Sequence, residues 1–340
     1  MDMVLPNDTV KSPPYRSGRP TIGLVLSGGG ARGLGHILAL EAFDEMNIKP
    51  DVIAGTSIGA MFGAAYASGL SAKQIKAHMS KVLAKRRQVL RGLIRSRGAP
   101  LQNMLRIFQL RGAILKPHAT LELVMPKGVA KSFEALSIPL HVVATDFQEQ
   151  SQVVMSSGDL LRAIAASIAI PSLFSPVRYK ETTLVDGGLV NPLPFDVIHD
   201  KADIIIAIVV SGGQAPLRHQ KPLKAIGTLL RSLQILQNSI VREKLKSLQP
   251  DILVELDVGQ FHALDFMKLD EILKAAAPAK QELKRKLTRV LEAQTLTVVE
   301  ETQHGGVNND LGTHAAYEEA GRETDTDRRR LADRLMGSAG

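Results

Sequence analysis

The chain has no cysteine among its 340 residues. Disulfides, thiolate metal sites and cysteine nucleophiles are therefore excluded, while the redox compartment is left open. No apolar run follows the basic residues of the first twenty positions, so no secretory signal is visible and a cytoplasmic location is expected. Hydrophobic residues make up 44% of the chain, which is enough to bury a sizeable core in one large domain or in two.

Charged residues are absent between Val52 and Ala72. This stretch is as long as a membrane span, and Gly55, Gly59 and Gly63 have the spacing of a helix-dimer motif. It is, however, rich in Gly, Ala, Ser and Thr rather than in Leu and Ile. That composition favours a buried strand, a turn and a helix over a membrane span.

Acidic residues are missing from Val52 to Leu121, although this segment contains twelve Lys and Arg between Lys73 and Lys116. Residues 71–95 carry apolar side chains near helical spacing. One interpretation is a packed helical cap, at about 71–120, with a solvated basic face. The other is a peripheral contact with an anionic membrane surface. We predict no nucleic-acid partner.

The sequence around Ser57 has the pattern of a nucleophile elbow. A short apolar strand runs into Gly55-Thr56-Ser57-Ile58-Gly59 and then into a small-residue helix. A serine at the tip of such a turn has strained backbone angles, and glycines two residues away on either side allow strand and helix to pack closely. Ser57 is therefore the candidate nucleophile, with Gly55 and Gly59 as its support.

A second glycine-rich turn, Gly28 to Gly33, follows a strand at 22–26 and precedes a helix at about 34–46. Its Gly-x-Gly-x-x-Gly spacing matches a dinucleotide-binding fingerprint, but the acidic residue expected at the end of the second strand is missing. No Lys-Ser/Thr pair follows the glycines, which excludes a P-loop. An oxyanion hole, in which backbone N–H groups stabilise a tetrahedral intermediate, is the favoured alternative.

The later segments predict more strands at 138–145, 152–155, 203–210 and 251–256, and helices at 160–168, 222–248 and 266–293. Asp186 stands at the end of another strand, before Gly187 and Gly188, which is a place for a site residue or for a plain tight turn. No cofactor motif and no metal-ligand spacing emerge. His199 is a weak candidate for catalysis, and His36 is expected to hold the glycine loop against its helix.

Together, the Gly28–Gly33 turn, the Gly55–Gly59 elbow and Asp186-Gly187-Gly188 resemble the patatin-like phospholipase family. The resemblance implies a three-layer α/β/α fold with a central, mostly parallel sheet. It also implies a Ser57/Asp186 dyad in which Asp186 accepts the proton, and lipid or phospholipid as the substrate. The implied oxyanion donors are Gly28, Gly29 and Gly30, and Arg32 would add positive charge or contact a substrate phosphate, with support from Gly33, Gly55, Gly59, Gly187 and Gly188.

We therefore predict a serine acyl hydrolase of carboxylic esters, with residues 21–200 as its catalytic domain and 201–300 as the C-terminal part of the same domain. A flexible leader at 1–20 and a disordered tail at 301–340, with one short helix near 328–336, are expected to flank it. Two alternatives are kept. One is a nucleotide-binding oxidoreductase using Gly28–Gly33, and the other is a patatin-fold membrane-binding regulator with little turnover.

Overall fold

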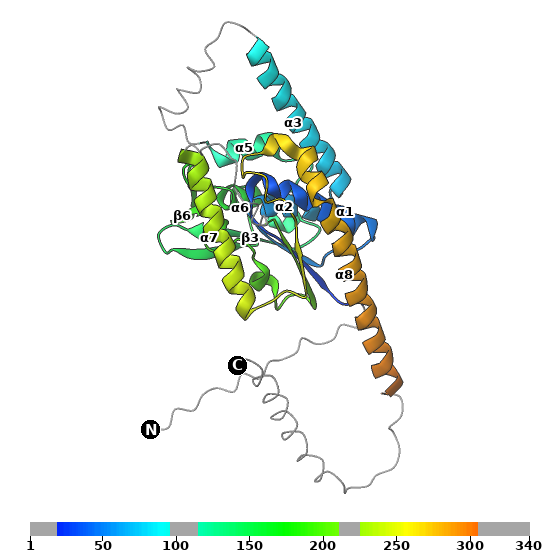
Figure 1. Cartoon of the computed structure of the whole chain (residues 1–340). Coiled ribbons are helices and arrows are strands. Elements are labelled where there is room, and N and C mark those ends of the chain that lie inside the picture. Colours follow the sequence, from blue (N-terminus) through cyan, green and yellow to red (C-terminus); the bar gives the residue numbers. More distant parts are fainter. Residues whose placement is uncertain (1–18, 96–114, 211–224, 305–340) are drawn as a thin grey trace, which may run out of the picture. The chain divides into compact units, whose positions relative to one another are not determined.

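The computed structural model describes residues 19–95, 115–210 and 225–304 (Figure 1). Residues 1–292 form one compact unit, which holds all the elements discussed below except the C-terminal end of one helix. Of the second unit, residues 293–340, only the end of one helix is described. The predicted leader and the predicted helix near 328–336 lie outside the described residues, apart from positions 19 and 20.

One sheet forms the centre of the first unit, with the strand order β5-β6-β3-β2-β1-β7-β8 and with β4 paired to β3. Pairing is parallel from β3 through β2, β1 and β7 to β8, and antiparallel around β4, β5 and β6. The strands are β1 (Ile22–Leu26), β2 (Val52–Thr56), β3 (Leu140–Asp146), β4 (Ser151–Met155), β5 (Val177–Tyr179), β6 (Thr182–Asp186), β7 (Ile204–Val209) and β8 (Ile252–Glu255).

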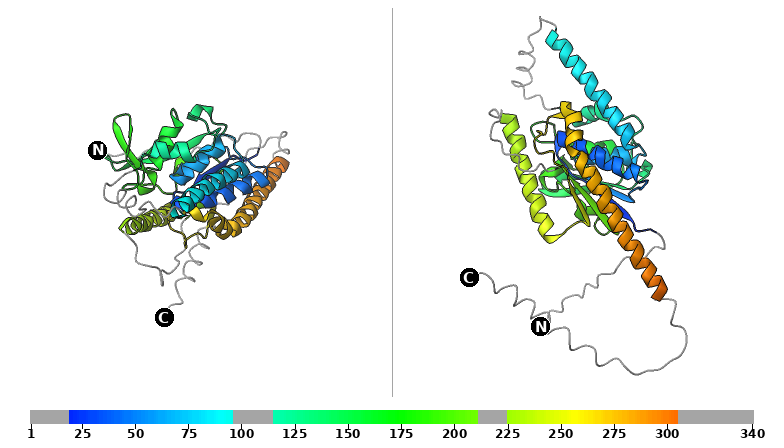
Figure 2. Two further views of the ribbon diagram at one scale, coloured as in Figure 1. Left: turned by 90° about the horizontal axis from the view of Figure 1, so that it is seen from above. Right: turned by 45° about the vertical axis from the view of Figure 1, so that its right-hand side comes forward.

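Helices cover both faces of this sheet, which explains why its parallel strands are apolar almost throughout. In β1, Leu24 and Leu26 pack with one set of helices, and Val25 faces the opposite core. The first core is built by α1 (His36–Glu45), α2 (Ile58–Ala67), α3 (Ala72–Arg95), α5 (Pro117–Val124), α6 (Leu160–Ser167) and α8 (Leu269–His304). The second is built by η4 (Phe195–Ile198) and α7 (Ala225–Ser247). The predicted three-layer α/β/α architecture is confirmed (Figure 2).

The uncharged stretch from Val52 forms strand β2, a turn at Ser57 and helix α2. All ten residues of α2 are buried, because it packs between the sheet and its neighbouring helices. No helix in the described part of the chain is long and apolar enough to cross a membrane. The interpretation of this stretch as a strand, turn and helix is confirmed.

Two predicted boundaries differ from the structure. The first glycine turn continues as a short 3-10 helix, η1 (Gly30–Gly35), so α1 begins only at His36. At the other end of the chain, α8 extends to His304, past the predicted end at 293 and into the predicted tail. Residues 294–304 contain neither Gly nor Pro, so the sequence offers no stop signal before Gly305-Gly306.

The predicted helical cap at about 71–120 is described only in part. Helix α3 and helix α5 are its two ends, and residues 96–114 between them lie outside the described residues. The apolar face of α3 packs into the core through Ile75, Met79 and Leu83, while Lys73 and Lys81 are exposed. The basic side of this helix therefore points to solvent in the part that the structure describes.

Strand β3 brings together two segments that are far apart in the sequence. Its residues Leu140 to Val143 pair with β2, and the last of these contacts is Val143 with Thr56. The next residue, Ala144, pairs with Asp186 of β6. Strand β4 pairs with Val142 to Asp146 of β3 and therefore lies along the other edge of β3. Strands β2 and β6 therefore lie one after the other along the same edge of β3. Asp186 follows directly after Thr56 on this edge and lies beside the turn that carries Ser57.

Candidate active site

Ser57 lies in a sharp turn between β2 and α2, with φ 56° and ψ −122°. Such backbone angles are strained for a residue with a side chain, so the surroundings must hold them in place. A Cβ on Gly59 would stand 2.2 Å from the carbonyl oxygen of Leu26, which shows how closely the start of α2 approaches β1. The Ser57 N–H donates to the Ser167 hydroxyl at 2.7 Å, and that hydroxyl donates to the Val143 carbonyl at 2.6 Å. The elbow predicted from the sequence is present.

Ser57 and Asp186 form a direct hydrogen bond. The Ser57 Oγ donates to the Asp186 Oδ2 at 2.6 Å, and both residues are buried. The other carboxylate oxygen, Oδ1, accepts the Gly188 N–H at 2.7 Å. Thr145 fixes the Asp186 backbone, because its hydroxyl donates to the Asp186 carbonyl at 2.8 Å. This arrangement gives a serine hydroxyl and a fixed proton acceptor in contact, as nucleophilic catalysis requires.

Burial changes the chemistry of the Asp186 carboxyl group. It raises the pKa of Asp186 to about 6, although the hydrogen bonds from Ser57 and Gly188 act in the opposite direction. Desolvation dominates because the charged form loses its hydration, whereas only two donors replace that water. A carboxylate with such a pKa is a stronger base than an ordinary aspartate and is still ionised at neutral pH.

The three glycines of the first turn are not equivalent as oxyanion donors. The Gly28 N–H donates to the Pro192 carbonyl at 2.9 Å, so Gly28 is withdrawn from the predicted donor set. The cause is the chain after Asp186, which returns alongside this turn. Among the described residues, no acceptor takes the N–H of Gly29 or of Gly30, and both residues line the pocket that contains Ser57. These two N–H groups are the candidates that remain.

Arg32 is a buried cation without an acidic partner in the described part of the chain. Its side chain is 2% exposed, its Nε donates to the Gly29 carbonyl at 3.2 Å, and its Nη1 has no hydrogen-bond partner there. Burial, and then the nearby Arg231 of α7, lower the pKa of Arg32 to about 10, so it stays charged at neutral pH. Buried charges are normally paired, and an unpaired guanidinium beside a pocket is suited to an anion.

A pocket lies above the dyad. Gly29, Gly30, Arg32, Ser57 and Asp186 provide its polar floor. Its walls are mostly apolar and come in part from α7, which lies across the pocket; they comprise Ile170, Pro171, Leu189, Leu230, Leu233, Gln234, Gln237 and Ala263. A largely apolar pocket with a few polar groups suits a molecule that combines an apolar part with a polar reacting group.

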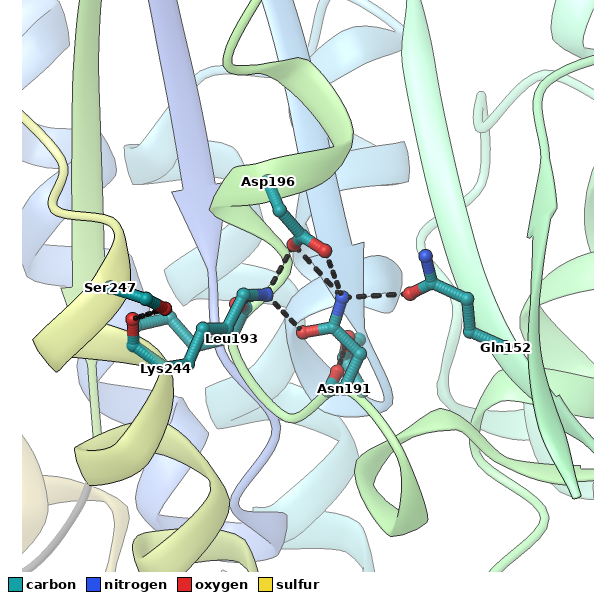
Figure 3. Close-up of polar contacts among 7 residues, drawn as sticks. Gln152, Asn191, Leu193, Asp196, Lys244 and Ser247 are labelled. Atoms are coloured by element: carbon teal, nitrogen blue, oxygen red, sulfur yellow. Dashed lines mark hydrogen bonds and ion pairs between the residues drawn. The ribbon is translucent and has the colours of Figure 1, made fainter. Parts of the chain in front are cut away.

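A partly buried polar network holds the segment that follows Asp186 (Figure 3). Lys244 of α7 forms an ion pair with Asp196 and donates to the Asn191 Oδ1 at 2.8 Å, while the Asn191 Nδ2 donates to Asp196 at 3.0 Å and to Gln152 at 2.8 Å. Burial lowers the pKa of Lys244, and the Asp196 carboxylate acts against this shift. The network thereby links α7 to the segment that follows Asp186.

The backbone of this segment connects the three parts of the site. The Asn191 carbonyl accepts the Thr56 hydroxyl at 2.8 Å, one residue before Ser57. The next carbonyl, that of Pro192, accepts the Gly28 N–H. Because Asp186 lies at the start of the same segment, the acid, the elbow and the glycine turn are tied to a single stretch of chain.

The structure brings all the predicted site residues together in this region. The supporting glycines stand where an added Cβ would come within 3.0 Å of another atom, namely at Gly33, Gly55, Gly59, Gly187 and Gly188. His36 is fully buried with its Nε2 2.9 Å from the Ser27 carbonyl, as expected for a structural role. His199 is exposed at the end of η4 and does not line the pocket.

Sequence reasoning missed several residues of the site. Lys244 and the pocket residues of α7 lie far along the chain, and no motif marks them. Ser167 precedes and Asn191 follows the Asp186-Gly187-Gly188 motif, and their roles depend on contacts with Ser57 and Thr56. Among the described residues, no group of three or more His, Cys, Asp or Glu side chains could hold a metal ion.

Comparison with known proteins finds relatives of this chain. An uncharacterized NTE family protein of Mycobacterium tuberculosis, Rv1063c, is 35% identical over 208 residues, which cover 61% of this chain and 54% of the relative. Lysophospholipase NTE1 of Pyricularia oryzae is 26% identical over 312 residues, which cover 83% of this chain and 19% of that protein. This chain thus spans about half the length of the mycobacterial relative and a smaller part of the fungal one.

Among solved structures, VipD from Legionella pneumophila is similar with a TM-score of 0.43 and 14% sequence identity, over 78% of this chain and 67% of VipD. The patatin-like phospholipase family matches residues 24–199, which are just over half of the chain and run from β1 past the segment after Asp186. The chain belongs to the patatin-like phospholipase family.

Proposed function

We propose that the protein is a serine acyl hydrolase that cleaves carboxylic ester bonds of lipids or phospholipids through a Ser57/Asp186 dyad. The observation that carries this proposal is the 2.6 Å hydrogen bond from the Ser57 Oγ to a buried carboxylate, at the floor of a largely apolar pocket. Family membership supports a lipid substrate, and one relative bears the name lysophospholipase.

The geometry supports a two-step reaction. The Ser57 Oγ attacks the ester carbonyl carbon as its proton passes to the Asp186 carboxylate. The carbonyl oxygen becomes an oxyanion that the Gly29 and Gly30 N–H groups stabilise. The intermediate collapses, and the departing alcohol takes the proton from Asp186. Water then attacks the acyl-Ser57 ester and gives its proton to Asp186. When the fatty acid leaves, Asp186 returns this proton to the Ser57 Oγ, which restores the hydroxyl.

Covalent labelling tests the proposal directly. We expect a fluorophosphonate to add once to the intact protein, with loss of fluoride, and we expect peptide mapping by mass spectrometry to place the adduct on Ser57. Ester hydrolysis should fall in proportion as the labelled fraction of the protein rises. An adduct on another residue, or active protein without any adduct, would contradict the proposed nucleophile.

Arg32 favours a phosphate-containing substrate over a neutral ester. Its Nη1 lacks a partner in the described part of the chain, its pKa leaves it charged at neutral pH, and Arg231 places a second guanidinium near it. Two nearby cations repel each other until an anion lies between them. We therefore propose that the two guanidinium groups hold the phosphate of a phospholipid while its ester reaches Ser57.

Substitution of Arg231 by glutamine should expose this preference. A charge-assisted hydrogen bond contributes about 1.5–3 kcal/mol, so kcat/KM for a phospholipid should fall by ~10-fold to ~100-fold. Hydrolysis of a neutral short-chain ester should be unchanged. The matched control is R242Q, which removes an exposed arginine of the same helix and should leave both rates unaltered. An equal loss on both substrates in R231Q would instead indicate a packing defect around Gln234, which accepts the Arg231 Nη1 hydrogen bond at 3.0 Å.

A further inference from the structure

Helix α7 covers the pocket with one side and is fixed at its C-terminal end. Leu230, Leu233, Gln234 and Gln237 line the pocket at helical spacing. Lys244 anchors the helix to the segment after Asp186, and Val241 packs into the second core. The orientation of the helix is therefore set by contacts that do not involve its outer surface.

The outer surface of α7 is unusually apolar. Nine large hydrophobic side chains are exposed in the described part of the chain, and four of them lie within residues 226–236. Ile235 and Leu236 are 56% and 59% exposed, and Ile226 and Leu229 are each 38% exposed. Ile226, Leu229, Leu233 and Leu236 recur three and four residues apart, so they form one ridge that continues from the pocket wall to the surface. Exposed apolar groups gathered in this way mark an interaction surface.

The charge pattern of the sequence before and within α7 indicates what covers this ridge. From Ile204 to Arg242 the sequence has no acidic residue and five basic ones, which are Arg218, Lys221, Lys224, Arg231 and Arg242. Residues 225–241 of α7 carry one charge, that of Arg231. Two copies of such a segment would oppose like charges, whereas an anionic surface would be attracted to it. Apolar side chains flanked by basic ones are the composition of a helix that lies in a membrane interface.

We propose that the exposed apolar ridge of α7, which carries Ile226, Leu229 and Leu236, docks on the surface of an anionic phospholipid bilayer together with the neighbouring side chain of Ile235. Docking there places the mouth of the Ser57 pocket at the interface, so that a lipid can enter along the apolar ridge without crossing water. This inference rests on the proposed lipid hydrolase function. It assigns membrane contact to α7, whereas the sequence pattern offers such contact only as one of two interpretations of the basic segment Lys73–Lys116.

The test uses the full chain and a triple variant, L229Q/I235Q/L236Q, whose three side chains are exposed and do not line the pocket. Binding is measured by cosedimentation with phosphatidylcholine vesicles that contain phosphatidylglycerol, and with vesicles of phosphatidylcholine alone. We expect the wild type to prefer the anionic vesicles, and we expect the variant to bind them at least ~10-fold more weakly. Vesicle phospholipid hydrolysis should fall similarly, whereas hydrolysis of a soluble short-chain ester should be unchanged.

A matched control is L123Q, which makes the same chemical change at a leucine of α5 that is 69% exposed. An equal loss of binding in L123Q, or no loss in the triple variant, would overturn the assignment to α7. Light scattering without lipid provides a further check, because a wild-type dimer that the triple variant abolishes would identify a second copy as the occupant and contradict the proposal. Vesicle binding that depends on α7, in a protein that hydrolyses no ester, would support docking and contradict the proposed function instead.

Discussion

Replacing Ser57 by alanine should lower kcat/KM for carboxylic esters by a factor on the order of 10⁶, as removal of the nucleophile does in serine hydrolases with comparable machinery. In the proposed reaction the Ser57 Oγ forms the acyl bond, and no other hydroxyl of the described residues donates to the Asp186 carboxylate. Stabilisation by the Gly29 and Gly30 N–H groups and substrate binding should leave only a small residual rate. The measurement is steady-state hydrolysis of a chromogenic short-chain ester.

The fold should survive this change. Alanine keeps the Ser57 N–H that donates to Ser167, and it adds no atom to the turn. An unchanged melting temperature, within a few degrees, and normal far-UV circular dichroism would confirm that the loss is chemical. A well-folded S57A that still hydrolyses the ester at a rate near that of the wild type would show that another residue is the nucleophile.

Replacing Asp186 by asparagine should lower turnover by about 10³-fold to 10⁴-fold, the range for loss of a general base or of its function. Asparagine has nearly the same shape and can still accept the Gly188 N–H through its oxygen. It cannot take the proton of Ser57. Measurement of kcat on a soluble ester, next to the wild type, gives the size of the effect.

The pH dependence identifies Asp186 more specifically. The reaction needs the ionised carboxylate, and burial raises the pKa of Asp186 to about 6. The wild-type kcat/KM should therefore fall about tenfold for each pH unit below 6 and level off above about pH 7. An ordinary aspartate would give this acidic limb of the pH profile near pH 4. The residual activity of D186N should lack the limb. A wild-type limb near pH 4, or the same limb in D186N, would assign the titration to another group.

The same pKa shift gives D186N an internal control. Because the folded protein holds the Asp186 proton more tightly than the unfolded chain, burying the charged carboxylate costs stability above pH 6, and this cost fades as the pH falls toward 3.8. Asparagine removes the cost. At pH 8 the free energy of unfolding of D186N should be at least that of the wild type, and higher by up to ~3 kcal/mol. Chemical denaturation at pH 8 and at pH 5 checks this, since the gain should shrink at the lower pH.

Much of the fold and of the site could be predicted because the requirements are local. A strained serine between a strand and a helix needs glycines two residues away, and the alternation of apolar strands with helices is typical of a covered parallel sheet. By contrast, only the family resemblance predicted that Ser57 and Asp186 lie close together. The physical cause of this proximity is the register of β3, in which Val143 pairs with Thr56 and Ala144 pairs with Asp186.

The sequence by itself determined the turn at Ser57, the glycine turn and the place of Asp186 at a strand end, because backbone geometry there depends on neighbouring residues. Only the tertiary structure decided that Pro192 takes the Gly28 N–H, that Asp186 is buried enough to become a stronger base, and that α7 lies across the pocket. These features depend on pairings between distant segments and on the loss of water around a charge. No short pattern in the sequence encodes such long-range pairings or the loss of water around a buried charge.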